Sequence, residues 1–186
     1  TNEEYLEIVT GKTAYLIEAA TRCGAILGGA DDAGVENAAQ FGLNLGIAFQ
    51  LVDDALDYGA SEEEAGKSVA ADLREGKATL PLILYMEKAE PAERERLQVL
   101  VRRIGAAKGR NETVVANGKG HAVSATDLES VIATVQRVRD TGAVERARDM
   151  AGHYAEAARQ NLDGFPPSPE TVLLGEALEY VVRRNK

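Results

Sequence analysis

The feature that most constrains the fold is a helical stretch that is apolar on nearly every side. Between Phe41 and Val52 only two side chains are strongly polar. Apolar residues recur along residues 35–58 at the three- and four-residue separations of an α-helix. A helix of this kind is stable when other elements cover it. We therefore expect a buried helix, in which Gly42 and Gly46 let a neighbouring helix approach closely.

The remaining residues follow the same helical period, and no alternating strand pattern with hairpin turns is present. Glycine, proline and capping residues divide the chain into helices. The predicted helices span residues 3–27, 35–58, 80–89, 92–104, 126–140, 143–161 and 169–184. Loops are expected over residues 59–78 and over residues 105–123, the latter exposed at least in part. The sequence thus predicts an all-α fold, a multi-helix bundle.

Local capping signals define several of these helix ends. Thr79 is a candidate N-cap, and Thr126–Glu129 has the pattern of a capping box. Gly142 fits the stop of the helix that this box opens. Ser168 is placed to cap the last helix, with Pro169 as its first residue.

The composition is that of an ordinary globular protein that needs no disulfide to form a core. Of 186 residues, 45% are apolar and 27% are charged. The net charge of -9 argues against a general nucleic-acid binder or a polybasic membrane binder. No apolar run approaches about 18 residues, so no transmembrane helix is expected.

The expected compartment is the cytoplasm. The N-terminal residues lack the basic and apolar regions of a signal peptide. The single cysteine, Cys23, cannot form an internal disulfide, which favours a reducing environment. We interpret Cys23 as a small core residue of the first helix.

Charge is distributed unevenly along the chain. Residues 1–88 carry 16 acidic and 6 basic side chains, whereas residues 89–186 carry 14 acidic and 15 basic side chains. The whole imbalance therefore lies in the first half. It indicates either a solvated acidic surface or a site that needs anions, and composition alone leaves both interpretations open.

The acidic residues concentrate at the end of the apolar helix. Gln50, Asp53 or Asp54, and Asp57 fall near one helical face. Carboxylates roughly 6 Å apart repel by about 3 kcal/mol at an effective dielectric constant near 20. The negative end of the helix dipole makes the position still less favourable, unless a cation compensates. Oxygen ligands without nearby His or Cys suit Mg²⁺, so the cluster indicates a magnesium site. The alternative interpretation is a helix end that reaches solvent and binds no metal.

Three lysines beside glycines lie on either side of this acidic cluster: Lys12, Lys67 and Lys77. Such lysines are compact donors for phosphate oxygens, although one lysine next to a glycine more often marks a turn. The segment around Lys12 is not a phosphate-binding P-loop, because Leu6 stands where that motif needs glycine.

Other polar residues give weaker signals. Asp31 and Asp32 lie in a predicted turn and are interpreted as loop residues. His121 and His153 have no partners at zinc-site spacing. The arginine pairs 102–103 and 183–184 are interpreted as solvated surface.

The acidic cluster and the segments around it resemble a known protein family. The segment Phe49–Asp57, FQLVDDALD, followed by Gly66–Leu82, GKSVAADLREGKATLPL, is similar to the second aspartate-rich region of trans-type polyprenyl diphosphate synthases. Upstream, Gly11–Ala14 resembles the lysine–threonine segment of that family. The order and spacing of these motifs agree with those of the family through about residue 90. Their amino-acid sequences are similar to those of long-chain octaprenyl and decaprenyl synthases.

The resemblance implies a fold and a reaction. The family fold is an isoprenoid synthase-type helical bundle around a central cavity, usually in a homodimer. The reaction condenses an allylic diphosphate with isopentenyl diphosphate and yields a polyprenyl diphosphate. Mg²⁺ ions between two aspartate-rich motifs assist departure of the allylic diphosphate.

The resemblance also assigns roles to individual residues. Asp53 would be the principal Mg²⁺ ligand, while Asp54 and Asp57 would complete or orient the metal shell. The residues that would hold the allylic diphosphate are Lys12, Lys67 and Lys77. Thr13 and Gln50 would position the allylic substrate and help stabilise its cation. With Lys12, these two residues are the candidate catalytic residues.

The first aspartate-rich motif of the family and its isopentenyl-diphosphate-binding segments have no counterpart in residues 1–186. The chain is therefore expected to be the C-terminal part of a single all-helical prenyl synthase domain. We expect it to be inactive alone, and to dimerise or aggregate through exposed apolar surface.

The alternative function is that of a non-catalytic helical subunit of a heteromeric prenyl synthase. Such partners often lose acidic or basic site residues. Here all three lysines and all three aspartates of the matching segments remain, which favours a catalytic chain. A helical protein with an accidental acidic patch is the least favoured interpretation.

Overall fold

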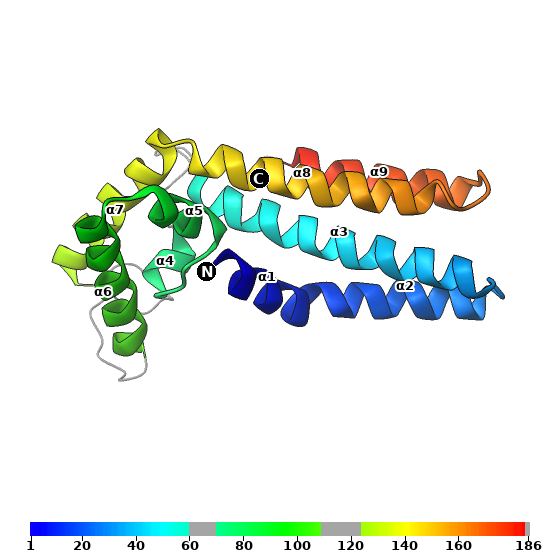
Figure 1. Ribbon diagram of the computed structural model, residues 1–186, viewed down its shortest axis with the longest axis horizontal. Helices are drawn as coiled ribbons and strands as arrows, with labels where there is room; N and C mark the ends of the chain where they lie inside the picture. The colour runs from blue at the N-terminus through cyan, green and yellow to red at the C-terminus, as the bar shows by residue number, and fades with distance from the viewer. Residues whose placement is uncertain (60–69, 109–123, 185–186) are drawn as a thin grey trace. The chain divides into compact units, whose positions relative to one another are not determined.

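A computed structural model describes residues 1–59, 70–108 and 124–184 of the chain. These residues form helices and no strand, which confirms the predicted all-α class. The element order is α1 (Asn2–Val9), η1 (Thr10–Ala14), α2 (Tyr15–Leu27), α3 (Asp32–Gly59), α4 (Ala71–Arg74), α5 (Leu80–Lys88), α6 (Pro91–Lys108), α7 (Ala125–Asp140), α8 (Ala143–Leu162) and α9 (Pro169–Arg183) (Figure 1). Short α4, inside the predicted loop 59–78, was not expected.

The chain divides into two compact units. The first unit comprises Thr1–Asp53 and Ala147–Lys186, and the second comprises Asp54–Arg146. The division falls within α3, between two adjacent aspartates of the acidic cluster.

In the first unit, α2 and the preceding π-helical turn η1 pack closely on α3 (Figure 1). A methyl group added to Gly46 would lie 2.6 Å from the Cα atom of Ala14. One added to Gly42 would lie 2.8 Å from the carbonyl oxygen of Ile17. The prediction that these two glycines admit a neighbouring helix is therefore confirmed.

The other side of α3 packs against the C-terminal helices. Side chains of α3, α8 and α9 form a core cluster in which Phe41 is 1% exposed. Its members are Phe41, Ala48, Ala155, Ala158, Leu162 and Leu178, with Leu45 and Tyr154 packed against them. The predicted burial of the apolar helix is confirmed by this packing.

The second unit is built around α5. Residues 80–85 of this helix are all buried, and α5 contacts both α6 and α7, which also contact each other. Gly76 has a φ of 75° and its backbone lies directly against Gly105. Gly105 is thus a packing position inside α6, and the expectation of a loop over residues 105–108 is wrong. Residues 109–123 lie outside the described part of the chain.

Capping differs from the prediction at α7 and agrees at α9. Ser124, not Thr126, is the N-cap of α7, and its hydroxyl accepts a hydrogen bond from the Asp127 backbone. Ser168 caps α9 as predicted, accepting from the Thr171 backbone N–H. Thr79 is the N-cap of α5 but makes no side-chain capping bond.

Large apolar side chains are exposed on helices of the first unit. They are Ile8, Tyr15, Leu16, Ile26 and Leu27 on α1 to α2, and Val172, Leu173, Leu174, Tyr180 and Val182 on α9. Cys23 of α2 is also exposed, so its interpretation as a core residue is wrong. The reason is that α2 turns one face toward α3 while none of its residues is fully buried. Among the described residues, no helix combines the length and the apolar character that a membrane span requires.

Candidate functional site

The acidic cluster occupies the C-terminal turns of α3, and its three carboxylates have different environments. The side chain of Asp53 is 56% exposed. Asp54 is buried, with 3% exposure. Asp57 is half-buried. Since the helix places these residues within little more than one turn, the differences come from the segments that pack against them.

Asp53, in the first unit, is bound by an arginine from the C-terminal end of α9. Nη2 of Arg184 lies 3.1 Å from Asp53 Oδ1 and donates a second hydrogen bond, of 3.0 Å, to the Phe49 carbonyl. The guanidinium group also lies over the Phe49 ring, 4.2 Å from its centre. These contacts contradict the interpretation of Arg184 as a solvated surface residue. Within the pair 183–184, that interpretation holds for Arg183.

Asp57, in the second unit, binds backbone instead of a charged side chain. Its two carboxylate oxygens accept hydrogen bonds from the N–H groups of Ala71 and Asp72, at 2.9 and 3.0 Å. Its own carbonyl accepts from Ala70, which has a left-handed φ of 52°. Burial raises the pKa of Asp57 to about 6, and the nearby Asp72 charge adds to this, while the two backbone hydrogen bonds oppose it. Asp57 therefore holds the start of α4.

The lysine–threonine segment forms η1, a single π-helical turn between α1 and α2. The hydroxyl of Thr13 in this turn donates a 3.2 Å hydrogen bond to Oε1 of Gln50 on α3. Ala14, beside it, is fully buried against Gly46. π-Helical turns occur frequently at functional sites. The structure thus brings together Thr13 and Gln50, which the sequence analysis had placed in one site from separate segments.

The three candidate lysines are found in different situations. Lys12 is exposed in η1. Lys77 forms ion pairs with Asp72 at 2.9 Å and Glu75 at 3.0 Å, and these hydrogen bonds raise its pKa. Lys67 lies outside the described residues.

Metal binding has to be judged from the carboxylates present. Within residues 1–59, 70–108 and 124–184, no group of three or more His, Cys, Asp or Glu side chains is arranged to hold a metal ion. Asp53 has an accessible carboxylate with oxygen donors of the type that Mg²⁺ binds. Mg²⁺ commonly takes one or two protein carboxylates and keeps several waters. Asp53 therefore fits as one ligand of a site that other ligands complete.

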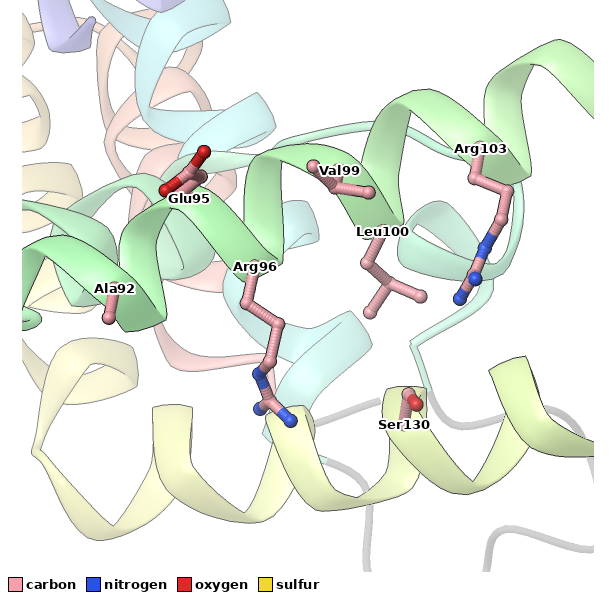
Figure 2. Close-up of a pocket in the computed structure, with 7 residues that line it drawn as sticks. All are labelled: Ala92, Glu95, Arg96, Val99, Leu100, Arg103 and Ser130. Carbon is pink, nitrogen blue, oxygen red and sulfur yellow. The ribbon is translucent and has the colours of Figure 1, made fainter.

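A groove between α6 and α7 is distinct from these residues. It has a volume of about 390 Å³ and is lined by Ala92, Glu95, Arg96, Val99, Leu100, Arg103 and Ser130. Figure 2 shows Arg96 and Arg103 extending from α6 toward α7. Arg96 is paired with Glu93, and Arg103 with Asp127. None of the predicted site residues in the described part of the chain lines this groove.

Sequence reasoning missed Arg184, and no local signal identifies it. The arginine pair near the chain's end has an ordinary composition, and Arg184 and Asp53 are 131 residues apart. The available sequence signal came from Asp53. An aspartate at the negative end of a helix needs a positive partner.

The fold places the chain in the class of all-helical polyprenyl synthases. A crystal structure of a decaprenyl diphosphate synthase from Rhodobacter capsulatus matches the whole chain with a TM-score of 0.79 and 34% identity, and 51% of that protein is covered. A polyprenyl synthase from Caulobacter crescentus, complexed with calcium and isoprenyl diphosphate, matches with a TM-score of 0.75 and 37% identity, again over 51% of its length.

Sequence comparison leads to the same class. The family described as polyprenyl synthetase matches residues 1–117, and the chain belongs to this family. A geranylgeranyl diphosphate synthase from Methanosarcina mazei is 35% identical over 185 residues, which is 100% of this chain and 49% of the relative. The chain thus spans about half the length of such relatives.

Proposed function

We propose that the chain supplies the second aspartate-rich half of the active site of a trans-polyprenyl diphosphate synthase, a prenyltransferase. The reaction would condense an allylic diphosphate with isopentenyl diphosphate and release inorganic diphosphate. The observation that carries the proposal is the accessible Asp53 carboxylate at the end of α3 in a member of the polyprenyl synthetase family. The Thr13–Gln50 hydrogen bond in the same unit supports it.

The cofactor in this proposal is Mg²⁺. Asp53 would hold it, and the diphosphate of the substrate would supply further oxygen ligands. When bound, the ion neutralises the charge of the leaving diphosphate. The Caulobacter relative, with its calcium and isoprenyl diphosphate, supports a divalent cation in the corresponding role. Asp54, which is buried, and Asp57, which binds backbone, would position the end of α3.

The side chains of this chain would bind and orient the substrate. Lys12, exposed in η1, would donate to the diphosphate oxygens, and Lys77 would do so after exchanging an acidic partner for phosphate. Lys67, which lies outside the described residues, would have the same role by the family resemblance. Thr13 and Gln50, held together, would present oxygen dipoles to the allylic group as positive charge develops there.

The assembly and location are further parts of the proposal. We propose a homodimer, supported by the exposed apolar side chains of α1, α2 and α9. We also propose a cytoplasmic location, which fits a single exposed cysteine. Light scattering of the whole gene product that contains this chain tests the dimer: a monomer at micromolar concentration would contradict it.

A condensation assay tests the proposed function. The whole gene product is incubated with labelled isopentenyl diphosphate, an allylic diphosphate and Mg²⁺, and with a chelator in a parallel reaction. We expect labelled polyprenyl diphosphate in the first reaction and none in the second. Residues 1–186 alone should give no product. Product that forms only after a second polypeptide is added would favour the alternative of a non-catalytic subunit.

A further inference from the structure

Arg184 packs against the last turns of α3 through three contacts of its guanidinium group. Its guanidinium donates to Asp53 Oδ1 at 3.1 Å and to the Phe49 carbonyl at 3.0 Å. It also lies 4.2 Å from the centre of the Phe49 ring. A planar guanidinium bound to a carboxylate, a carbonyl and a ring face is fixed in both position and orientation.

The exposure of this arginine separates it from its neighbour. The Arg184 side chain is 14% exposed, whereas the Arg183 side chain is 79% exposed and pairs with Glu179 one turn earlier. A largely buried guanidinium is stable when a nearby anion compensates its charge. Asp53 is that anion, so the carboxylate that fits a metal ligand is already paired with a positive group.

We propose that Arg184 is the built-in counter-ion of Asp53 and that a divalent cation must displace it to bind there. This role rests on the proposed function. In it, Arg184 is a positioning residue that sets the metal affinity of Asp53. A guanidinium and a divalent cation on the same carboxylate are like charges a few ångströms apart, and they repel each other. Mg²⁺ also requires near-octahedral oxygen positions, which a fixed guanidinium on Oδ1 obstructs.

This competition has two measurable consequences, because coupling between two binding events is reciprocal. Removing the charge of Arg184 strengthens metal binding at Asp53. Conversely, metal binding loosens the end of α9, where the Arg184 amide donates to the Tyr180 carbonyl at 3.1 Å. A residue that merely stabilised the fold would give neither effect, since its loss would leave metal affinity unchanged or reduce it.

The test uses Mn²⁺ alone as the probe, because it accepts the same oxygen ligands as Mg²⁺. Free Mn²⁺ is measured by electron paramagnetic resonance with the whole gene product in the absence of diphosphate. We expect Arg184→Gln to bind Mn²⁺ about tenfold more tightly than the wild type. Arg183→Gln, the matched loss of one positive charge, should bind like the wild type. Arg184→Lys keeps the charge and should remain nearer to the wild type than Arg184→Gln.

An Asp53→Asn variant separates failure of this inference from failure of the proposed function. If Asp53→Asn weakens Mn²⁺ binding but Arg184→Gln binds like the wild type, the counter-ion role is wrong and the metal assignment stands. If Mn²⁺ binding is indifferent to Asp53→Asn, or is absent from every variant both without and with added inorganic diphosphate, both are overturned. Hydrogen exchange of the α9 C-terminal peptide should accelerate when Mn²⁺ is added to the wild type. Unchanged exchange at saturating Mn²⁺ would contradict the displacement of Arg184.

Discussion

Asp53 and Asp57 are one helical turn apart on α3, yet they belong to different units and have different partners. Asp53 is 56% exposed and pairs with a guanidinium. Asp57 binds two backbone N–H groups at the start of α4. An exposed carboxylate is accessible to a cation, whereas a carboxylate that binds backbone N–H groups is part of the scaffold. Two aspartates of one sequence motif can therefore have different chemical roles.

The largest expected effect is on turnover. In the whole gene product, Asp53→Ala should lower condensation activity by roughly 100-fold or more, because an oxygen ligand of the metal is lost. Asp57→Asn should lower it by about 10- to 100-fold, the range for residues that orient a metal site indirectly. Steady-state kinetics with labelled isopentenyl diphosphate measures both.

The control for these variants is Asp149→Ala, which removes an exposed carboxylate of α8. Its turnover should match that of the wild type. If Asp53→Ala were also close to the wild type, the metal assignment would be wrong. If Asp57→Asn had the larger effect of the two variants, the contrast between exposed ligand and scaffold would be reversed.

Asp57 should also make the stability of the fold depend on pH. Burial raises the pKa of Asp57 from 3.8 to about 6. The folded state then binds this proton more tightly than the unfolded state does. The resulting stabilisation is fully present below pH 3.8 and is lost as pH rises through 6. It amounts to at most about 3 kcal/mol.

Urea unfolding of the metal-free protein between pH 4 and 7 measures this dependence. Because other groups also titrate, the informative quantity is the difference between the wild type and Asp57→Asn. The variant should lack the loss of stability between pH 4 and 6 that Asp57 causes. Identical pH dependence of the two proteins would show that Asp57 is not buried as described.

A smaller effect is expected from the close approach of η1 to α3 in the first unit. Gly46→Ala places a methyl group 2.6 Å from the Cα atom of Ala14, so η1 must move away from Gln50. We expect the free energy of unfolding to fall by about 1–3 kcal/mol. The Thr13–Gln50 hydrogen bond should break as well.

Gly24→Ala is the matched control, since a methyl group at Gly24 in α2 meets nothing within 4 Å. That variant should be as stable as the wild type or more stable by up to about 1 kcal/mol, because alanine favours the helix. Thermal unfolding of both variants tests the contrast. Equal destabilisation would mean that Gly46 has no special packing role.

The smallest effect concerns the N-terminus of α9, the helix that carries Arg184 to Asp53. Ser168→Ala removes the capping bond that the Ser168 hydroxyl accepts from the Thr171 backbone N–H. It should cost about 1 kcal/mol of stability.

Thr126→Ala, at the residue that the sequence had favoured as the cap of α7, should cost less stability than Ser124→Ala, because Ser124 makes the capping bond. Chemical unfolding midpoints of the three variants decide this.

The helical class, most helix bounds, the burial of Phe41 and the acidic cluster at the end of α3 could all be predicted from the amino-acid sequence. These features follow from periodicity, capping and side-chain spacing, which act between residues close together in the chain. The Ser168 cap and the glycine contacts of α3 were predictable for the same reason.

The partners of the aspartates and the exposure of several side chains depend on contacts between distant segments. Tertiary structure paired Asp53 with an arginine 131 residues away, bound Asp57 to the backbone of α4 and exposed Cys23 on α2. α6 also continues through Gly105, where the backbone of Gly76 lies against it. The physical reason is that a side chain's partner and exposure depend on which distant segment lies against it. Local sequence shows that a carboxylate needs a counter-charge, but only packing selects which group provides it.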